Sequence, residues 1–321
     1  MARRYFDVIE GLKEAAARFR DKDVLRWTAI YMVGELLIMI AMFAAAIGAI
    51  VSSFSKGNGA LALAGFSALL AGFVALVAFA MYAIPRAVRA AMKADGIKVA
   101  PKPPGVLEYF VFTVRLTLIN LSCWYDKKLL APSTALLAMA VLAAICALLA
   151  PALSYAVWVI AIVLFVFSLL AGMTGILVHA ERTKFAVHML LRGDGPESAM
   201  PLKSYGLVNG QTFEVYAAGA LGGAWLYAVR MVIDIFSRVL MYALLVPVIL
   251  VGGSAGSGAM LLVGIALVVL LFLAIIFAWA FIEMAVWRVY LADMFKFYDA
   301  MGPVKKTAGA PKKAAKKAKK R

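Results

Sequence analysis

Residues 27–54 read WTAIYMVGELLIMIAMFAAAIGAIVSSF, and this stretch decides the fold. Glu35 is its one side chain that is charged at neutral pH, and the run exceeds the roughly 20 apolar residues that a helix needs to cross a bilayer. Across the 321 residues, 65% are hydrophobic, against about 45–50% in soluble domains. Short segments of strict apolar–polar alternation, which mark a membrane barrel, do not occur. The sequence therefore predicts an all-α, polytopic membrane protein.

Five further apolar runs accompany this first one. The six predicted spans are residues 27–54, 61–84, 129–150, 152–179, 239–251 and 259–286. The linkers inside successive pairs, SSFSKGNGA, APALS and GGSAGSG, are short and rich in residues that form tight turns. We therefore expect three transmembrane hairpins.

The basic residues predict the orientation of these spans. All but one of the 33 lysines and arginines fall in residues 1–26, 85–128, 180–238 and 288–321, and the exception is Lys56. Because basic residues near span ends stay in the cytoplasm, both termini and both long loops should be cytoplasmic. The predicted location is the cell membrane, with the chain crossing it several times.

An amphipathic segment precedes each predicted hairpin. In YFDVIEGLKEAAARFRDKD, apolar and charged side chains recur with helical spacing on opposite faces, as in helices that lie along lipid headgroups. More apolar counterparts occur around residues 107–124 and 213–237. The chain thus reads as three parallel repeats of about 100 residues, each an interfacial helix and two spans. An eight-span alternative, in which 107–124 and 213–237 also cross, is disfavoured by the charge distribution, while their partial insertion stays open.

This interpretation divides the chain into seven segments. They are a cytoplasmic amphipathic helix (1–26), the first hairpin (27–84), a loop with the second amphipathic helix (85–128), the second hairpin (129–179), a loop with the third amphipathic helix (180–238), the third hairpin (239–287) and a basic disordered tail (288–321).

The hinges RFRDKDVLRW and CWYDKKLLAP, together with the loop AERTKFAVHMLLRGDGPESAM, carry a resemblance to a known group. The pattern resembles a broad group of six-span membrane proteins related to the membrane domain of glycerophosphodiester phosphodiesterases. The resemblance covers residues 1–290 and implies the fold. It transfers no functional residue, because many members of the group have no assigned activity.

Ionisable side chains within or beside the spans are the candidate site residues, since such groups are costly in a bilayer and often functional. They are Glu35, Arg115, Glu214, Arg230, Asp234 and Glu283. Glu35 lies roughly 12 Å along the first span, and it serves either as a proton or cation site or as a structural hydrogen-bond partner. Our hypothesis is that Glu35 meets Arg115 or Arg230.

Local spacing suggests other partners for these residues. Arg230 and Asp234 are one helical turn apart and can form an ion pair. Arg288 can draw Glu283 toward the interface. Arg115 has no carboxylate one turn away, so its partner must come from another segment, with Glu35 or Glu214 as candidates.

The sequence gives no reason to expect an enzyme, a metal site or a cofactor. His179 and His188 are nine residues apart, which is not a metal-binding spacing on one helix face. The glycine-rich GGSAGSG lacks the lysine of a phosphate-binding loop.

The C-terminal residues APKKAAKKAKKR form a positively charged tail without large apolar side chains. Its candidate contact residues are Lys312, Lys313, Lys316, Lys317, Lys319, Lys320 and Arg321. Such a tail can bind anionic lipid or the phosphates of nucleic acid, or it can serve only as a topological marker.

Three classes of function are consistent with these observations. The first is a channel-like or translocation component of unknown substrate, one version being the membrane pore subunit of a DNA-transfer machine with a separate ATPase. The second is a membrane scaffold or membrane-shaping protein, and the third, least supported, is an enzyme acting on lipid. The expected partners are the lipid bilayer and its anionic lipids, with protein partners or further copies of the chain, and with nucleic acid at the tail.

Overall fold

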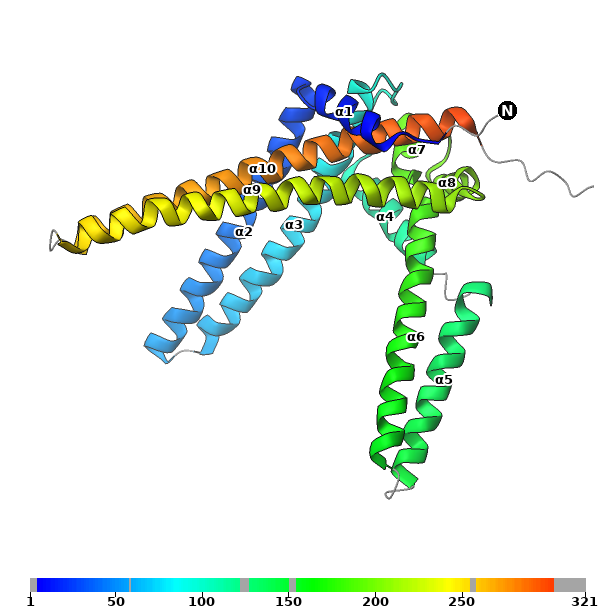
Figure 1. The fold of residues 1–321 in the computed structure, drawn as a ribbon, viewed down its shortest axis with the longest axis horizontal. Coiled ribbons are helices and arrows are strands. Elements are labelled where there is room, and N and C mark those ends of the chain that lie inside the picture. The colour runs from blue at the N-terminus through cyan, green and yellow to red at the C-terminus, as the bar shows by residue number, and fades with distance from the viewer. Residues whose placement is uncertain (1–4, 58, 122–126, 150–153, 255–257, 303–321) are drawn as a thin grey trace, which may run out of the picture. The chain divides into compact units, whose positions relative to one another are not determined.

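The computed structural model describes residues 5–57, 59–121, 127–149, 154–254 and 258–302 (Figure 1). These residues form helices and, within the described ranges, no strands, which confirms the all-helical prediction. The helices are α1 (Val8–Arg18), α2 (Lys22–Lys56), α3 (Gly59–Ala94), α4 (Val106–Leu121), α5 (Lys127–Leu149), α6 (Ser154–Thr183), α7 (Ala186–Arg192), the 3₁₀ helix η3 (Glu197–Ala199), α8 (Met200–Val208), α9 (Thr212–Ser254) and α10 (Gly258–Met301).

Five helical segments are long and apolar enough to cross a membrane, and they correspond to α2, α3, α6, α9 and α10. This finding agrees with a membrane-embedded protein. In α5 the apolar stretch is shorter and covers Ser133–Leu148, so the sixth span stays a prediction. In four of the five long segments only 6% of the apolar window is buried, so most of its surface is available to lipid or to other chains.

The chain divides into two compact units. Unit 1 comprises Met1–Val106 and Ala217–Phe297, and unit 2 comprises Leu107–Tyr216 and Tyr298–Arg321. Unit 1 thus contains α1 to α3 with most of α9 and α10, and unit 2 contains α4 to α8.

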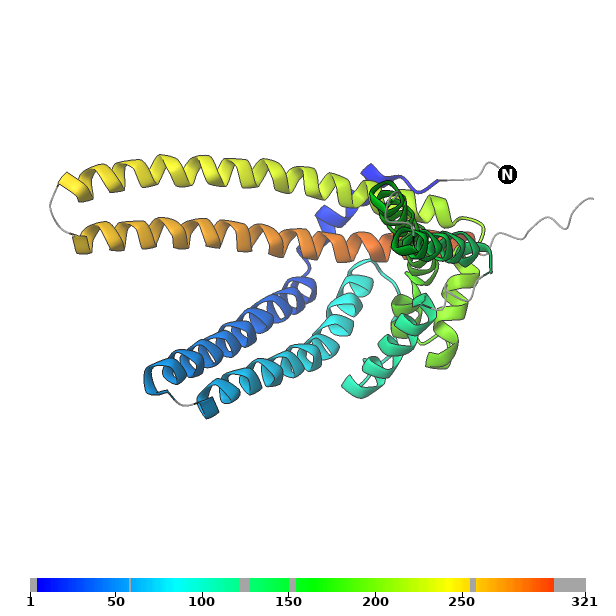
Figure 2. The same ribbon diagram turned by 90° about the horizontal axis from the view of Figure 1, so that it is seen from below.

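In unit 1, α2 packs along α3, and α9 runs beside α10 in both views (Figures 1 and 2). Glycines permit the close approach within these pairs. A Cβ atom at Gly34 would collide with Phe79, and one at Gly222 would lie 2.6 Å from the Tyr290 ring. Tyr290 is fully buried there, and its hydroxyl donates to the Ala218 carbonyl oxygen at 2.7 Å.

Aspartates determine where the first two helices begin. The Asp7 carboxylate accepts from the backbone nitrogens of Ile9 and Glu10 at 3.0 and 3.1 Å, and Asp21 caps α2 in the same way. These bonds satisfy donors that the first turn of a helix leaves without partners. At the far end, Gly57 terminates α2 with a φ of 60°, a left-handed conformation that favours glycine.

The first predicted amphipathic helix corresponds to α1, and part of it is buried against the rest of unit 1. The buried residues of α1 are Gly11, Leu12 and Ala15, whereas Ile9 is 67% exposed. Small residues set this face because α1 lies close to α10, where a Cβ atom at Gly11 would be 3.3 Å from the Asp293 carboxylate.

One helix replaces two elements that the sequence suggested separately. The third amphipathic segment, 213–237, and the fifth span, 239–251, form the single helix α9. No glycine or proline separates the two segments, and Pro247 lies inside the helix, as proline does in membrane helices when neighbouring groups compensate for the missing donor.

In unit 2, α5 packs along α6, and buried serines link the two helices. Ser133 donates to the Ser168 carbonyl oxygen at 3.0 Å, and Ser168 donates to the Ser133 carbonyl oxygen at 2.8 Å. The short helices α7 and α8 pack on each other, with Ser204 accepting from the Phe185 nitrogen and donating to the Arg182 carbonyl oxygen. Reciprocal bonds of this kind satisfy buried hydroxyls without water.

Candidate functional site

Unit 1 contains two sets of polar side chains on three otherwise apolar helices, and we name the two sets together the polar seam. Its members are Thr28, Tyr31 and Glu35 of α2, Arg230 of α9, and Glu283 and Arg288 of α10. Half of these residues, Glu35, Arg230 and Glu283, were candidates from the sequence.

An interhelical ion pair forms one part of the seam. Nη1 of Arg230 lies 3.6 Å from Oε2 of Glu283, and the two side chains are 45% and 24% exposed. The pair borders a cavity of about 350 Å³. The cavity is lined by Gly223, Leu226, Arg230, Ala280, Glu283, Met284 and Trp287. A charged pair beside a cavity between two apolar helices is the arrangement in which polar groups can contact a passing solute.

Arg288 forms the other part of the seam. Its Nη1 donates to the hydroxyl of the fully buried Thr28 at 3.3 Å, and its guanidinium lies 4.8 Å from the centre of the Tyr31 ring. Tyr31 in turn shares a hydrogen bond with Glu35, one helical turn along α2. Arg288 therefore joins α10 to α2, and it contributes a cation to the neighbourhood of Glu35.

The remaining contacts suggested from the sequence can be compared with the structure. Arg230 lies against Glu283, and the described part of the chain shows no ion pair between Arg230 and Asp234. Arg115 is exposed on α4 of unit 2, so its suggested contact with Glu35 joins the two units and stays a prediction. Glu214 lies near Tyr298, also in unit 2.

Several predictions fall outside the described residues. They concern the tail from residue 303, which includes the contact residues 312–321, the hinge around Trp124 and the turns at 150–153 and 255–257. The disorder predicted for residues 288–301 is wrong, because α10 continues to Met301. The contact of the tail with lipid or nucleic acid stays a prediction.

A second charged cluster of unit 1 was not anticipated from the sequence. Asp95 has a fully buried side chain that pairs with Arg18, and the Lys296 ammonium lies 2.9 Å from its carbonyl oxygen and 3.5 Å from Oδ2. Arg18 also lies 2.6 Å from Glu14 and 3.9 Å from Asp293. The cluster connects α1, the end of α3 and α10, and only the turn-forming sequence ADGIK after α3 marks Asp95 as unusual.

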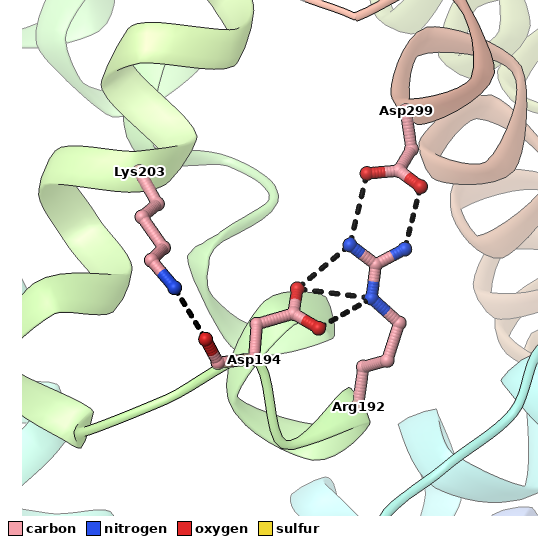
Figure 3. A network of polar contacts seen from close by, with 4 residues as sticks. All are labelled: Arg192, Asp194, Lys203 and Asp299. Atoms are coloured by element: carbon pink, nitrogen blue, oxygen red, sulfur yellow. Dashed lines mark hydrogen bonds and ion pairs between the residues drawn. The ribbon is translucent and has the colours of Figure 1, made fainter.

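Unit 2 has its own charged network, shown in Figure 3. Arg192 binds Asp299 through two parallel contacts of 2.5 and 2.9 Å, and it binds Asp194 at 2.7 Å. Lys203 donates to the Asp194 carbonyl oxygen. The hydrogen bonds to Asp299, and then those to Asp194, raise the pKa of Arg192 above its ordinary value. Bidentate contacts of this kind fix orientation, so the network holds the end of α10 on α7.

His188 of α7 is buried beside this network. Its ring packs edge-on against Phe185, with ring centres 6.0 Å apart. Burial, with a smaller contribution from the charge of Lys184, lowers the pKa of His188 to about 4. The imidazole is therefore neutral at pH 7 and acts as a packing group in the unit 2 core.

Comparison with known proteins gives no further assignment: no family model, curated protein or solved structure matches the chain. The resemblance to the six-span group stays a prediction from the sequence motifs.

Proposed function

We propose that this chain is a non-enzymatic, channel-like or translocation component of the cell membrane. In this proposal it crosses the bilayer six times as three hairpins, with both termini in the cytoplasm. The observation that carries the proposal is the Arg230–Glu283 pair, which borders a cavity between two apolar helices. A cation and an anion at that position would set which charge passes, because charged side chains that line a pore determine its ion selectivity.

The exposed helix surfaces support assembly into an oligomer. Most of the apolar surface of α2, α3, α9 and α10 is not covered by the chain itself. Further copies of the chain, or a different membrane protein, would cover part of that surface and close a path around the polar seam. Lipid would cover the rest.

Charge removal at the seam should alter ion selectivity in opposite directions. In planar bilayers with asymmetric KCl, Glu283→Gln should lower the cation-to-anion permeability ratio by roughly twofold or more, because it leaves the Arg230 charge unbalanced. Arg230→Gln should raise the ratio for the converse reason. The reversal potential of the reconstituted full chain measures both effects.

Matched controls remove the same charges elsewhere. Glu10→Gln and Arg20→Gln change exposed residues of the N-terminal segment and should leave the reversal potential unchanged. A shift of equal sign for both seam variants, or no conductance from chain that has inserted correctly, contradicts the proposal.

The membrane scaffold is the second candidate function, and one surface favours it. A groove of about 610 Å³ runs between α1 and α9. Its apolar lining includes Ile9, Leu221 and Trp225, each of which is at least 60% exposed. A scaffold would use this surface for membrane contact and would show no conductance.

The DNA-transfer version of the translocation proposal rests on the sequence of the tail. Its lysines would neutralise phosphates on DNA or contact an acidic partner. A nucleotide-hydrolysing partner that co-purifies with the native chain would support this version over a simple channel.

A further inference from the structure

Three basic residues follow the apolar part of α3, and they are Arg86, Arg89 and Lys93. Their spacing of three, four and seven residues places them on one face of the helix. The apolar run that precedes them ends at Ile84. In the predicted six-span topology, these cations lie where the helix leaves the hydrocarbon region.

These side chains line a small cavity in unit 1. The cavity measures about 120 Å³. It is lined by Asp23, Trp27, Arg86, Arg89, Ala90, Lys93 and Pro103. Since a water molecule occupies about 30 Å³ in the liquid, the cavity has the volume of about four water molecules, which is the size of a small anion. Three cations and one carboxylate line it, so it favours an anion.

Fixed contacts hold both arginines in place. The Arg86 guanidinium lies 3.7 Å from the centre of the Tyr82 ring and 5.8 Å from that of Trp27, and its Nη1 donates to the Tyr82 carbonyl oxygen at 2.6 Å. Arg89 donates to the carbonyl oxygens of Ala100 and Pro101 at 2.6 and 2.9 Å. The cavity is thus built before any ligand arrives.

One donor at this site has no acceptor. Nε of Arg89 is buried and forms no hydrogen bond among the described residues. Leaving such a donor without an acceptor costs about 1–3 kcal/mol, and more when the group is charged. The guanidinium of Arg89 still adds its positive charge to the cavity lining.

The surrounding aromatic residues indicate the depth of the cavity. Trp27 and Tyr82 contact each other, with ring centres 6.1 Å apart. Tryptophan and tyrosine concentrate at the level of the lipid headgroups. Large apolar side chains of α2 and α3, including Leu37 and Val74, are exposed along the hairpin and can contact acyl chains.

From this geometry we propose that the cavity binds the phosphate of an anionic phospholipid headgroup. Arg86, Arg89 and Lys93 supply the charge, and Trp27 forms an apolar part of the cavity wall. A free phosphate has the same oxygen chemistry but lacks acyl chains to lie along α2 and α3. The proposal requires only that the chain lies in a membrane, and it does not depend on the passage of any substrate.

The test compares three probes on the full chain in uncharged detergent. The probes are dihexanoyl phosphatidylglycerol, dihexanoyl phosphatidylcholine and inorganic phosphate, with binding measured by native mass spectrometry. Phosphatidylglycerol should bind, phosphatidylcholine should bind at least roughly tenfold more weakly, and an equal concentration of inorganic phosphate should not displace the lipid. Displacement by inorganic phosphate at that concentration overturns the lipid assignment in favour of a free-anion site.

Charge-matched variants test the position of the site. Arg86→Gln with Lys93→Gln should weaken phosphatidylglycerol binding roughly tenfold or more. Lys98→Gln with Lys102→Gln removes the same charge from exposed residues of the following loop and should change binding by less than about twofold. The swap Arg86→Lys with Lys93→Arg keeps the charge and should preserve binding. Equal weakening in the first two pairs overturns the proposal, because it would mean general charge attraction, which includes the basic tail.

Discussion

Replacing Arg18 with alanine should lower the free energy of unfolding by roughly 2 kcal/mol. Removing one partner of a buried pair costs about 3–5 kcal/mol when the remaining charge has no compensation. The Asp95 side chain is fully buried, but Arg18 is 33% exposed and Lys296 stays near Asp95, so solvent and the second cation reduce the loss. Titration of the detergent-solubilised chain with sodium dodecyl sulfate measures the change.

Two comparisons test the reason for this loss. Glu14→Ala removes the more exposed partner of Arg18, at 42% side-chain exposure, and should cost less than about 0.5 kcal/mol. Adding Asp95→Ala to Arg18→Ala should recover part of the loss, because no buried charge then lacks its partner. Losses that simply add would show that the two residues do not interact.

Replacing Tyr290 with alanine should cost about 4 kcal/mol of unfolding free energy, since buried aromatic residues truncated to alanine typically cost 3–5 kcal/mol. The ring is fully buried in unit 1. It packs against Phe6 and Trp287, each with ring centres 5.5 Å apart, and against the backbone at Gly222. A cavity at this position would loosen α1, α9 and α10 together. The midpoint of the same denaturant titration reports the loss.

Tyr242→Ala is the matched control, because this tyrosine of α9 is 62% exposed and should cost less than about 1 kcal/mol. Tyr290→Phe keeps the ring and removes the hydrogen bond to Ala218, with an expected loss of about 1 kcal/mol. If Tyr290→Ala and Tyr242→Ala have equal effects, the packing assigned to Tyr290 is wrong.

Local signals in the sequence predicted where helices occur, but they did not predict which neighbouring helices continue into one another. The apolar run 27–54 and the charged segment before it correspond to α2 and α1, because Asp7 and Asp21 cap those helices through contacts within three residues. The continuity of α9 was missed. Arg230, Asp234 and Arg238 were placed on the last turns of an interfacial helix separate from the fifth span. A helix nevertheless continues through charged residues when nothing interrupts its backbone hydrogen bonds.

The polar seam was half visible in the sequence. Glu35, Arg230 and Glu283 were conspicuous because a charge within or beside an apolar run is costly. Their partners were not predictable from periodicity, since Arg230 and Glu283 lie on different helices and Arg288 reaches Thr28 across a separation of 260 residues.

The two charged clusters near the helix ends were missed for the same reason. Arg18 and Asp95 are 77 residues apart, and Arg192 and Asp299 are 107 apart. In the sequence each of these residues resembles an ordinary charge in a solvated segment. Only tertiary packing distinguishes a buried carboxylate such as Asp95 from its exposed neighbours.

The six-crossing topology is the central claim of this account, and cysteine labelling in intact cells tests it most directly. After replacement of Cys123 and Cys146 by serine, the substitutions Ser55→Cys, Lys98→Cys and Ser198→Cys place single thiols at exposed described positions. These positions follow the first, second and fourth predicted spans. The reagent is a maleimide that cannot cross the bilayer.

If the chain crosses the membrane six times, the thiol at position 55 reacts in intact cells, while those at positions 98 and 198 react only after permeabilisation. When α5 and α6 both cross the membrane, positions 98 and 198 lie on the same side. When α6 crosses and α4 and α5 do not, the two positions lie on opposite sides, and α5 is the helix with the shorter apolar stretch. Reaction at position 198 in intact cells, with position 98 protected, would contradict six crossings.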